Sequence, residues 1–518
     1  MPPKRKRVPK VDLQAEFRTG AVQALVTQAI SEKVPAAAPR VPSAIVPGVP
    51  PWVPPAMLES LTAALCSEED HVAMGLFMAL LSVRRYRFMK SPHAKGFLLM
   101  RHDGATYEKQ EGPSNMIVSA QRTTRDAVSR LIDLLGPVVV EPEVEEGGDA
   151  TEEEIQNALR RRAAFLLNCQ LGQAQYLRNV RAQMQQIMET DAFYAEQELP
   201  TPGEFFGVLD ANPTLLGFTN GVMNVMEPGG GMRFYERDQV PADYAVSLRV
   251  PFAYEGAPDG EPRDGAQQHQ MHEVEAKFRR MFLALPMWDA ARHIFGSVVY
   301  GGNSAGRAAH PLLGPTSNGK SWAYKFLRSG LGDGYVASFD KTLVIKTTRP
   351  PDDSAPTHQL TRIYRVRAAF CSETGEEDEP NDKFKGWLGG DMAIVRPMYG
   401  QMYEAPVQAK FFIPSNFPLK HDSNDPAWAC PRVGRLRSAL SFDTGFRSDV
   451  QQDEPLKGIY KADDGNELQR FYEERRHAVL LLILQWAREF AHHGFVLPLT
   501  PESVARSRQL AAGSCAGF

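Results

Sequence analysis

The sequence has little cysteine, no excess of basic charge and no long apolar run. Its 518 residues include 5 cysteines, which are scattered without a C-x-x-C pair. We therefore expect a reducing compartment, with neither a disulfide framework nor a cysteine zinc site. The apolar runs are too short to span a bilayer and no secretory signal is visible, which predicts a soluble intracellular protein without a membrane partner. The net charge of −4 gives no support from composition for nucleic-acid binding, although a ring with a basic channel and an acidic exterior also fits it.

Changes in composition divide the chain into five segments. Residues 1–56 are basic and then proline-rich, which predicts a disordered tail and linker. Residues 57–200 carry apolar side chains at helical spacing and predict a mostly helical N-terminal domain. Residues 201–270 predict a β-rich segment, residues 271–455 an α/β core, and residues 456–518 a helical lid and tail.

Two charged stretches have more than one interpretation. Lys4 to Arg7 is a basic run that fits a nuclear-import address or a nucleic-acid-binding arm, and equally a solvated tail. Residues 14–33, which follow it, can form a helix. Residues 141–154 hold eight acidic residues and two glycines, which predicts an exposed loop of undefined role.

The strongest signal is a loop that matches the phosphate-binding pattern G-x-x-x-x-G-K-[ST], formed by Gly314, Pro315, Thr316, Ser317, Asn318, Gly319, Lys320 and Ser321. The glycines let successive N–H groups point at phosphate oxygens, the lysine supplies a positive charge, and the final serine offers a hydroxyl to Mg²⁺. A short apolar stretch precedes the loop and a helical pattern follows it. This context predicts a site for ATP and Mg²⁺, although a bare match can also occur by chance.

Two polar residues follow apolar strands further along the chain. The stretch from Arg367 to Cys371 predicts a buried strand that ends in Ser372-Glu373, and a carboxylate at that point can polarise an attacking water or support a hydrated Mg²⁺. The alternative is that Glu373 only caps the next turn. A second apolar strand ends at Asn416, whose amide can orient the water or sense the γ-phosphate.

A cluster of arginines precedes the apolar stretch at residues 440–442: Arg432, Arg435 and Arg437. An arginine that reaches the γ-phosphate bound by a neighbouring subunit stabilises the charge of the transition state. Taken alone, these arginines are better explained as surface residues or as partners of Asp422 and Asp425 than as an arginine acting on a neighbouring subunit.

The motifs occur in the order Asn318-Gly-Lys-Ser321, Cys371-Ser-Glu373, Lys385-Gly-Trp-Leu-Gly-Gly-Asp391 with Arg396, Asn416-Phe-Pro418, and the arginines before Phe442. This order resembles the superfamily-3 helicases, and is most similar to their poxvirus, giant-virus and phage or plasmid primase–helicase branch. Residues 216–225 and 478–498 resemble the segments that flank the helicase in that branch, so the resemblance spans roughly residues 57–501.

The resemblance implies an α/β fold, namely a P-loop NTPase with an AAA+-like superfamily-3 helicase core, a mostly helical N-terminal domain and a helical C-terminal lid. It implies that Lys320 and Ser321 contact phosphate and Mg²⁺, that Glu373 is the catalytic acid beside the metal, and that Asn416 is a sensor. Arg435 corresponds to the arginine acting in trans, with Arg432 or Arg437 as alternatives.

The same resemblance implies two DNA contacts. Lys385 and Arg396 lie in the motif that bears DNA-contacting loops in the channel, and both can neutralise phosphates. For Lys385 a helix-surface lysine is the alternative.

The expected function is that of an ATP-dependent replicative DNA helicase, a homo-hexameric ring on single-stranded or forked DNA of a viral, phage or related genome. Related proteins carry an N-terminal primase domain, whereas only about 56 residues precede the first folded unit here. We therefore expect no primase activity and a separate primase or DNA polymerase as partner. In a eukaryotic virus the location would be the host nucleus or a cytoplasmic viral factory. Alternatives are a DNA packaging or remodelling ATPase, or a nucleotide-stabilised structural ring or origin-binding scaffold.

Overall fold

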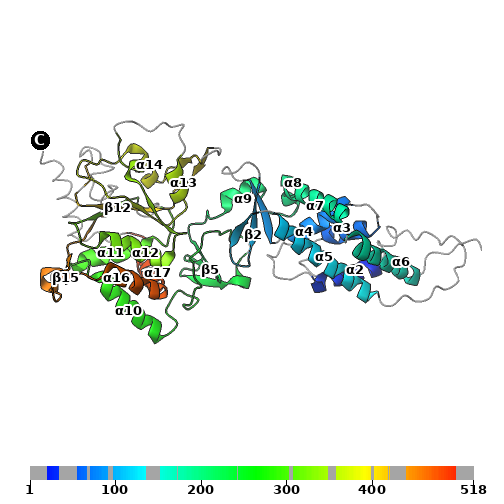
Figure 1. Cartoon of the computed structure of the whole chain (residues 1–518), viewed down its shortest axis with the longest axis horizontal. Coiled ribbons are helices and arrows are strands. Elements are labelled where there is room, and N and C mark those ends of the chain that lie inside the picture. The colour runs from blue at the N-terminus through cyan, green and yellow to red at the C-terminus, as the bar shows by residue number, and fades with distance from the viewer. Residues whose placement is uncertain are drawn as a thin grey trace, which may run out of the picture. The chain divides into compact units, whose positions relative to one another are not determined.

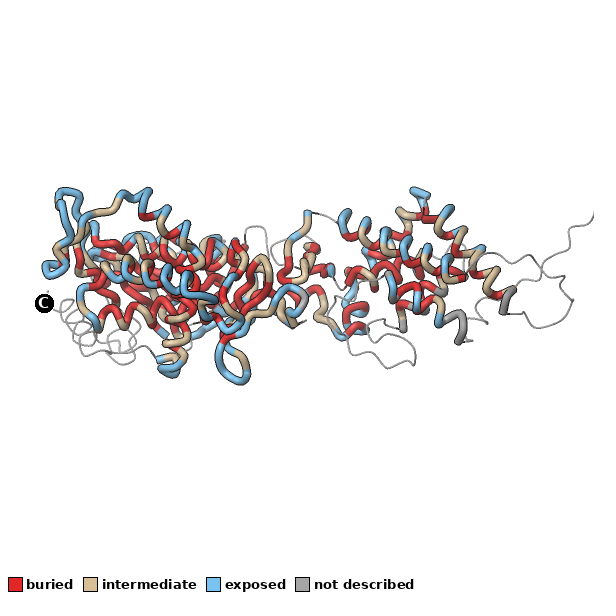
Figure 2. Tube along the Cα trace, turned by 90° about the horizontal axis from the view of Figure 1, so that it is seen from below, coloured by how far each residue is buried: buried red, intermediate tan, exposed pale blue. Residues whose placement is uncertain are grey.

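The computed structural model describes residues 20–33, 55–66, 71–83, 85–90, 97–111, 113–135, 152–171, 173–241, 243–302, 307–347, 357–397, 402–417, 419–420 and 439–496. These residues form two compact units, one ending at Gly207 and the other beginning at Val208 (Figure 1). In each unit the buried residues lie along the inward faces of its elements (Figure 2).

The first unit is mostly helical, as the sequence predicts. Its helices are α2 (Gly20–Lys33), α3 (Pro55–Cys66), α4 (His71–Ser82), α5 (Ser114–Leu134), α6 (Glu152–Phe165), the π-helix η1 (Leu166–Gln170), α7 (Ala174–Met188), α8 (Asp191–Glu196) and α9 (Pro202–Val208). An antiparallel sheet in the order β1-β2-β3 (Tyr86–Lys90, Phe97–His102, Tyr107–Gln110) completes the unit. His102 pairs with Tyr107, so residues 103–106 form the turn between β2 and β3.

One part of the predicted tail belongs to the core of this unit. Val26, Ala29 and Ile30 of α2 are buried in the same apolar cluster as α3, α4 and α5. The prediction of a disordered tail over residues 1–56 is therefore wrong for Gly20–Lys33. The helix that residues 14–33 were expected to form is present over Gly20–Lys33, and packing of its apolar face stabilises it.

The second unit begins with a small antiparallel sheet in the order β4-β5-β6 (Leu215–Phe218, Gly221–Asn224, Arg233–Glu236). Phe218 pairs with Gly221, so Thr219 and Asn220 form the two-residue turn and Gly221 is the first residue of β5. The 3-10 helix η2 (Arg237–Gln239) and helices α10 (Gly265–Arg279) and α11 (Leu285–Ser297) follow and lead into the main sheet.

The main sheet has five parallel strands in the order β13-β7-β12-β9-β8. Their bounds are Leu440–Ser441, His310–Leu313, Lys410–Ser415, Ala368–Cys371 and Val336–Phe339. Because β7 pairs with β12 on one side and β13 on the other, strands distant in sequence flank it. This confirms an α/β fold with a parallel sheet.

Helices cover both faces of this sheet (Figure 1). On one face, Phe370 and Phe412 pack in a cluster with α10, α11, α12 (Lys320–Leu331), α16 (Gly465–Glu474) and α17 (Arg476–His492). On the other face, Phe411 and Ile413 pack with α13 (His358–Ile363) and α14 (Asp382–Gly389). Successive residues of β12 point to opposite faces, and both faces are covered, so its inner residues Phe411, Phe412 and Ile413 are all apolar.

Four short strands and two 3-10 helices complete the described part of the second unit. The hairpin β10-β11 (Ala393–Val395, Tyr403–Ala405) is antiparallel, and β14 (Gly445–Arg447) pairs in parallel with β15 (Ile459–Lys461). The 3-10 helices η3 (Lys341–Leu343) and η4 (Pro455–Lys457) lie in connections. Among the helices of the described residues, every one falls short of the length and apolarity needed to cross a membrane.

Candidate functional site

The loop between β7 and α12 has a backbone that requires its glycines. Gly314 has φ of 151° and Gly319 has φ of 95°, a region that side chains other than glycine rarely tolerate. A Cβ at Gly314 would overlap the Asn318 amide and the Phe442 carbonyl. Asn318 is buried and donates its Nδ2 hydrogen to that carbonyl at 2.8 Å. The strand, loop and helix expected from the sequence are therefore all present.

Lys320, the first residue of α12, is buried with its ammonium turned back toward the loop. The Nζ atom donates to the carbonyls of Gly314 and Pro315, the latter at 2.9 Å, and to the Oδ1 of Asn416 at 2.9 Å. Burial lowers the pKa of Lys320, and the nearby Glu373 charge opposes that effect. Among the described residues its acceptors are neutral oxygens, so no direct bond to a carboxylate cancels the positive charge.

Asn416 connects this lysine to the predicted acid. Its Oδ1 accepts from Lys320, and its Nδ2 donates to the Oε1 of Glu373 at 2.7 Å. The three side chains follow β7, β12 and β9, which are neighbours in the sheet, and their carboxyl ends lie at one edge because the strands are parallel. The structure thus brings together Lys320, Asn416 and Glu373, here called the edge cluster, although 96 residues separate the first two.

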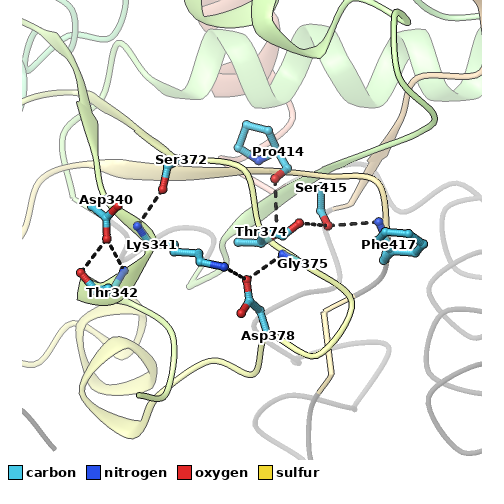
Figure 3. Close-up of polar contacts among 10 residues, drawn as sticks. All are labelled: Asp340, Lys341, Thr342, Ser372, Thr374, Gly375, Asp378, Pro414, Ser415 and Phe417. Atoms are coloured by element: carbon cyan, nitrogen blue, oxygen red, sulfur yellow. Dashed lines mark hydrogen bonds and ion pairs between the residues drawn. The ribbon is translucent and has the colours of Figure 1, made fainter. Parts of the chain in front are cut away.

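The loop that carries Glu373 is held from both sides (Figure 3). On the β12 side, Thr374 donates its N–H to Pro414 O at 3.1 Å, and Ser415 donates its hydroxyl to Thr374 O at 3.3 Å. Ser415 in turn accepts the N–H of Phe417 at 3.1 Å. These bonds extend the β9–β12 pairing past the strand ends and fix the residue next to Glu373.

On the β8 side, the carboxylate of Asp378 closes the same loop (Figure 3). It accepts the N–H of Gly375 at 2.7 Å and the Nζ hydrogen of Lys341 at 2.8 Å. The backbone N–H of Lys341 donates to the Oγ of Ser372 at 2.9 Å. The hydrogen bond from Lys341 to Asp378 raises the pKa of that lysine and keeps it charged. The sequence analysis missed this pair, because nothing local marks residues 37 positions apart as partners.

The residues present fit Mg²⁺ only together with phosphate and water. Ser321 and Glu373 are both exposed, so their oxygens are accessible. Among the described residues no group of three or more His, Cys, Asp or Glu side chains is arranged to hold a metal. Mg²⁺ bound to nucleotides keeps several waters and takes one or two protein oxygens plus phosphates, so this donor set suits it.

A cavity of about 480 Å³ opens beside the loop, on the side of α10, α16 and β14. Ser317, Gly319 and Ser321 contribute one wall, and Trp322, Phe446 and Tyr472 supply aromatic surface. The sequence analysis identified the loop residues and none of the others. The one sequence feature that pointed to any of the other lining residues was the helical spacing of Leu468 and Tyr472, and this spacing also fits ordinary core packing.

The remaining predicted residues lie away from the edge cluster or outside the described residues. Lys385 is on α14, on the opposite face of the sheet from α12, with Nζ 3.4 Å from Asp382. Arg396 follows β10, and its backbone N–H donates to the Oγ1 of Thr357 at 2.7 Å. Arg432, Arg435 and Arg437 fall outside the described residues.

The Gly-Gly-Asp sequence has a local structural role. Gly390, with φ of 100°, ends α14 in the left-handed conformation that favours glycine. The N–H of Asp391 donates to Gly386 O at 3.0 Å. These residues therefore terminate the helix that bears Lys385 and lead into β10.

Comparison with known proteins gives a distant relationship to a viral protein. No protein-family model matches the chain. A stretch of 200 residues, 37% of this chain, is 24% identical to the uncoating factor OPG117 of Vaccinia virus (strain Western Reserve). It covers 25% of that protein, so the chain spans about a quarter of the relative's length. Among solved structures, the apo C-terminal region of NrS-1 (305–718) matches with a TM-score of 0.30 and 11% identity, over 56% of this chain and 60% of that one.

Proposed function

We propose that the chain hydrolyses ATP and uses the energy as a replicative DNA helicase of the superfamily-3 type, in the replication of a viral or related genome. The observation that carries this proposal is the edge cluster. A charged lysine, a strand-end amide and a strand-end carboxylate, which the sequence motifs assign to ATP hydrolysis, are joined by hydrogen bonds at 2.9 and 2.7 Å.

The sheet order supports a ligand at this edge. Numbered along the chain, the strands run fifth, first, fourth, third and second across the sheet. From β7 the chain passes to β8 at the far edge of the sheet, and the last strand, β13, pairs with the opposite side of β7. The connections to β8 and to β13 therefore run in opposite directions from β7. In open α/β sheets, ligands bind at the carboxyl ends of the strands at such a switch point.

Each member of the edge cluster has a role in the proposed hydrolysis. Lys320 exchanges its bonds to the loop carbonyls for bonds to the β- and γ-phosphates, and the N–H groups at the start of α12 face the same anion. Ser321 and Glu373 would hold the hydrated Mg²⁺, which supplies charge stabilisation to the phosphates. Glu373 accepts a proton from the attacking water, and Asn416 orients that carboxylate.

The DNA-directed part of the proposal depends on the order of motifs and on the resemblance described above. In a homo-hexameric ring, Arg435 of one subunit would complete the ATP site of the next, and Lys385 and Arg396 would contact the phosphates of single-stranded DNA. The distant similarity to a Vaccinia virus protein favours a viral genome as the substrate.

The test is ATP hydrolysis by the full chain with Mg²⁺, with and without single-stranded DNA. Lys320→Ala should abolish turnover, because the phosphates lose their main cation. Lys346→Ala, which removes a lysine paired with Glu379 at the surface, is the matched control and should retain activity.

Three outcomes are informative. Stimulation by DNA that vanishes in Lys320→Ala supports the motor, and a forked-duplex unwinding assay then tests strand separation. Hydrolysis indifferent to DNA supports the ATPase and overturns the helicase assignment. Equal turnover in Lys320→Ala and the unmodified chain overturns the site itself.

A further inference from the structure

A segment that follows β13 is attached to the phosphate-binding loop and its approach at three points. The N–H of Phe442 donates to Leu313 O at 2.7 Å, and the N–H of Phe446 donates to Ser317 O at 3.0 Å. Between these bonds, the Nδ2 of Asn318 donates to Phe442 O at 2.8 Å. Residues 442–446 are here called the strap. The strap is fixed at its start, because the Phe442 ring is buried in the apolar core of the second unit.

The side chain of Asn318 joins the strap to Lys320. Asn318 is 1% exposed, and while its Nδ2 donates to the strap, its Oδ1 accepts from the Nζ of Lys320 at 3.3 Å. A primary amide carries both donors and an acceptor, so one side chain can make both bonds. The missing Cβ of Gly314 leaves room for this amide. Asn318 therefore links a fixed part of the core to the cation of the edge cluster.

Two neutral amides hold the Lys320 ammonium. The Oδ1 of Asn318 lies 3.3 Å from Nζ, and the Oδ1 of Asn416 lies 2.9 Å from it. Neutral oxygens orient the ammonium hydrogens and leave the charge available to an anion, whereas a carboxylate at the same distance would cancel much of it. Because both amides are side chains outside the row of loop carbonyls, their bonds can persist when phosphates replace those carbonyls. The direction in which Lys320 presents its charge thus depends on both amides.

The backbone of the loop depends on the strap as well. Ser317 has φ of 61°, in the left-handed region that residues with a side chain seldom adopt. Its carbonyl accepts the N–H of Phe446, so a bond to the strap offsets part of the cost of this conformation. A loop that is already held in its binding shape loses less conformational freedom when a ligand arrives. The strap therefore preorganises the loop.

From these contacts we propose that Asn318 is a positioning residue, whose amide ties the phosphate-binding loop to the strap and aims the Lys320 ammonium at the phosphates of the nucleotide. The inference rests on the proposed ATP hydrolysis and deepens it. Asn318 acts through Lys320, whereas Glu373 is held by Asn416 and by the bonds around Thr374. Loss of the Asn318 amide should therefore weaken phosphate binding and leave the chemical step largely unchanged.

The test measures KM and kcat for ATP hydrolysis by the full chain with Mg²⁺, and the binding of inorganic tripolyphosphate by calorimetry. Asn318→Ala should raise KM about tenfold or more, as expected when a hydrogen bond to a charged group is lost, and change kcat by less than about threefold. It should weaken tripolyphosphate by the same factor as ATP, because the effect concerns the phosphates alone.

Asn318→Asp has nearly the same size and carries the test if the alanine variant does not fold. Its carboxylate cannot donate to Phe442 O, and it would pair with Lys320 and repel the phosphates. This variant should bind tripolyphosphate at least about tenfold more weakly than the unmodified chain, and more weakly than Asn318→Ala. An aspartate variant with the affinity of the unmodified chain would contradict the proposed position of the amide beside the cation.

Asn224→Ala is the matched control. Asn224 in β5 is 6% exposed, its Nδ2 donates to the Tyr244 hydroxyl at 2.9 Å, and its Oδ1 accepts the N–H of Met226 at 3.1 Å. The variant therefore loses the same kind of buried amide in the small antiparallel sheet that precedes the core. It should leave KM and the affinity for tripolyphosphate unchanged, even where it lowers the unfolding temperature.

The outcomes separate the positioning role from the proposed function. Unchanged KM and unchanged tripolyphosphate affinity in both Asn318 variants would overturn the positioning role and leave the phosphate site intact. An equal rise in KM in Asn318→Ala and Asn224→Ala would also overturn it, because a general loss of stability would explain both. If the unmodified chain neither binds tripolyphosphate nor hydrolyses ATP, the proposed function fails, and the positioning role fails with it.

Discussion

Lys320 and Lys410 are two buried lysines of the same unit with different surroundings. Lys320 lies at the carboxyl edge of the sheet beside Asn416, and Glu373 favours its charged form. Lys410, the first residue of β12, donates to the carbonyl of Gly302. Burial, with a smaller contribution from the neighbouring Arg367, lowers the pKa of Lys410 to about 7. The nearby Glu373 charge favours the protonated form of Lys320, which is the form that binds phosphate. The neighbouring Arg367 disfavours the protonated form of Lys410, so a charge there destabilises the fold.

Glu373→Gln should separate binding from hydrolysis. Glutamine has the same shape and its amide oxygen still accepts from Asn416, but it cannot take a proton from water. ATP affinity should stay within about threefold, and the rate of hydrolysis should fall about 10²- to 10⁴-fold, as is usual for loss of a general base. Steady-state hydrolysis and calorimetric binding measure the two effects, and unchanged turnover would remove Glu373 from the mechanism.

Lys410→Met should make stability less dependent on pH. Because an unfolded lysine has a pKa of about 10.4 and the folded one about 7, the unfolded chain binds the extra proton between these values. Stability of the unmodified chain should therefore rise with pH over this window, by up to about 1.4 kcal/mol per pH unit from this group. Below pH 7 the full cost of the buried charge is present.

The measurement is urea unfolding of both chains from pH 6 to pH 10. The variant should have the larger free energy of unfolding near pH 7. The difference should shrink toward pH 10, because protonation of Lys410 stabilises the unfolded chain less as the pH approaches the unfolded pKa of about 10.4. A difference independent of pH would mean that Lys410 is not charged by unfolding in this window.

At the scale of elements, the loop after β9 determines where Glu373 lies. Strand pairing with β12 holds Thr374 on one side, and Asp378 holds Gly375 on the other. Lys341, the first residue of η3 after β8, donates to the Asp378 carboxylate at 2.8 Å. Three adjacent strands therefore position one catalytic candidate, and the sequence identified the ends of β9 and β12, but not that of β8, as part of the site.

Asp378→Ala should impair hydrolysis without impairing nucleotide binding. The change releases the N–H of Gly375 and the Lys341 ammonium, so Glu373 loses its fixed position, and small misplacements of a catalytic group are costly. We expect a loss of about tenfold or more in kcat and an ATP affinity within about twofold. Glu377→Ala is the control, because that carboxylate is exposed and pairs with Lys420 at the surface. Equal kcat values in the two variants would contradict the bracing role.

At the scale of the whole molecule, the two units have separate apolar cores. One cluster joins α2 to α8 with the first sheet, and the others are confined to residues beyond Gly207. The loop, the edge cluster and the cavity all belong to the second unit. Units with their own cores unfold as separate cooperative transitions unless their interface is large and apolar.

Calorimetry of the full chain should show two unfolding transitions, and ATP with Mg²⁺ should raise the midpoint temperature of only one of them. A ligand at 100 times its dissociation constant stabilises the unit that binds it by about 2.7 kcal/mol. Lys320→Ala should remove the shift and leave both transitions otherwise in place. A nucleotide-dependent shift of both transitions would contradict the assignment of binding to the second unit alone.

The sequence by itself determined the features that depend on a few consecutive residues. The phosphate-binding loop and the strands that end at Cys371 and Ser415 follow from local backbone requirements and apolar runs. Glycine at positive φ and alternating burial are properties of short segments, so they are visible without the fold.

Only the tertiary structure decided which of these segments meet. The order of strands placed Asn416 between Lys320 and Glu373, 96 and 43 residues away in sequence. Packing between elements distant in sequence also paired Lys341 with Asp378, buried α2 in the first core and formed the cavity around Tyr472. Apolar periodicity specifies that a face is buried and not what covers it, because side-chain packing between distant elements selects the partner.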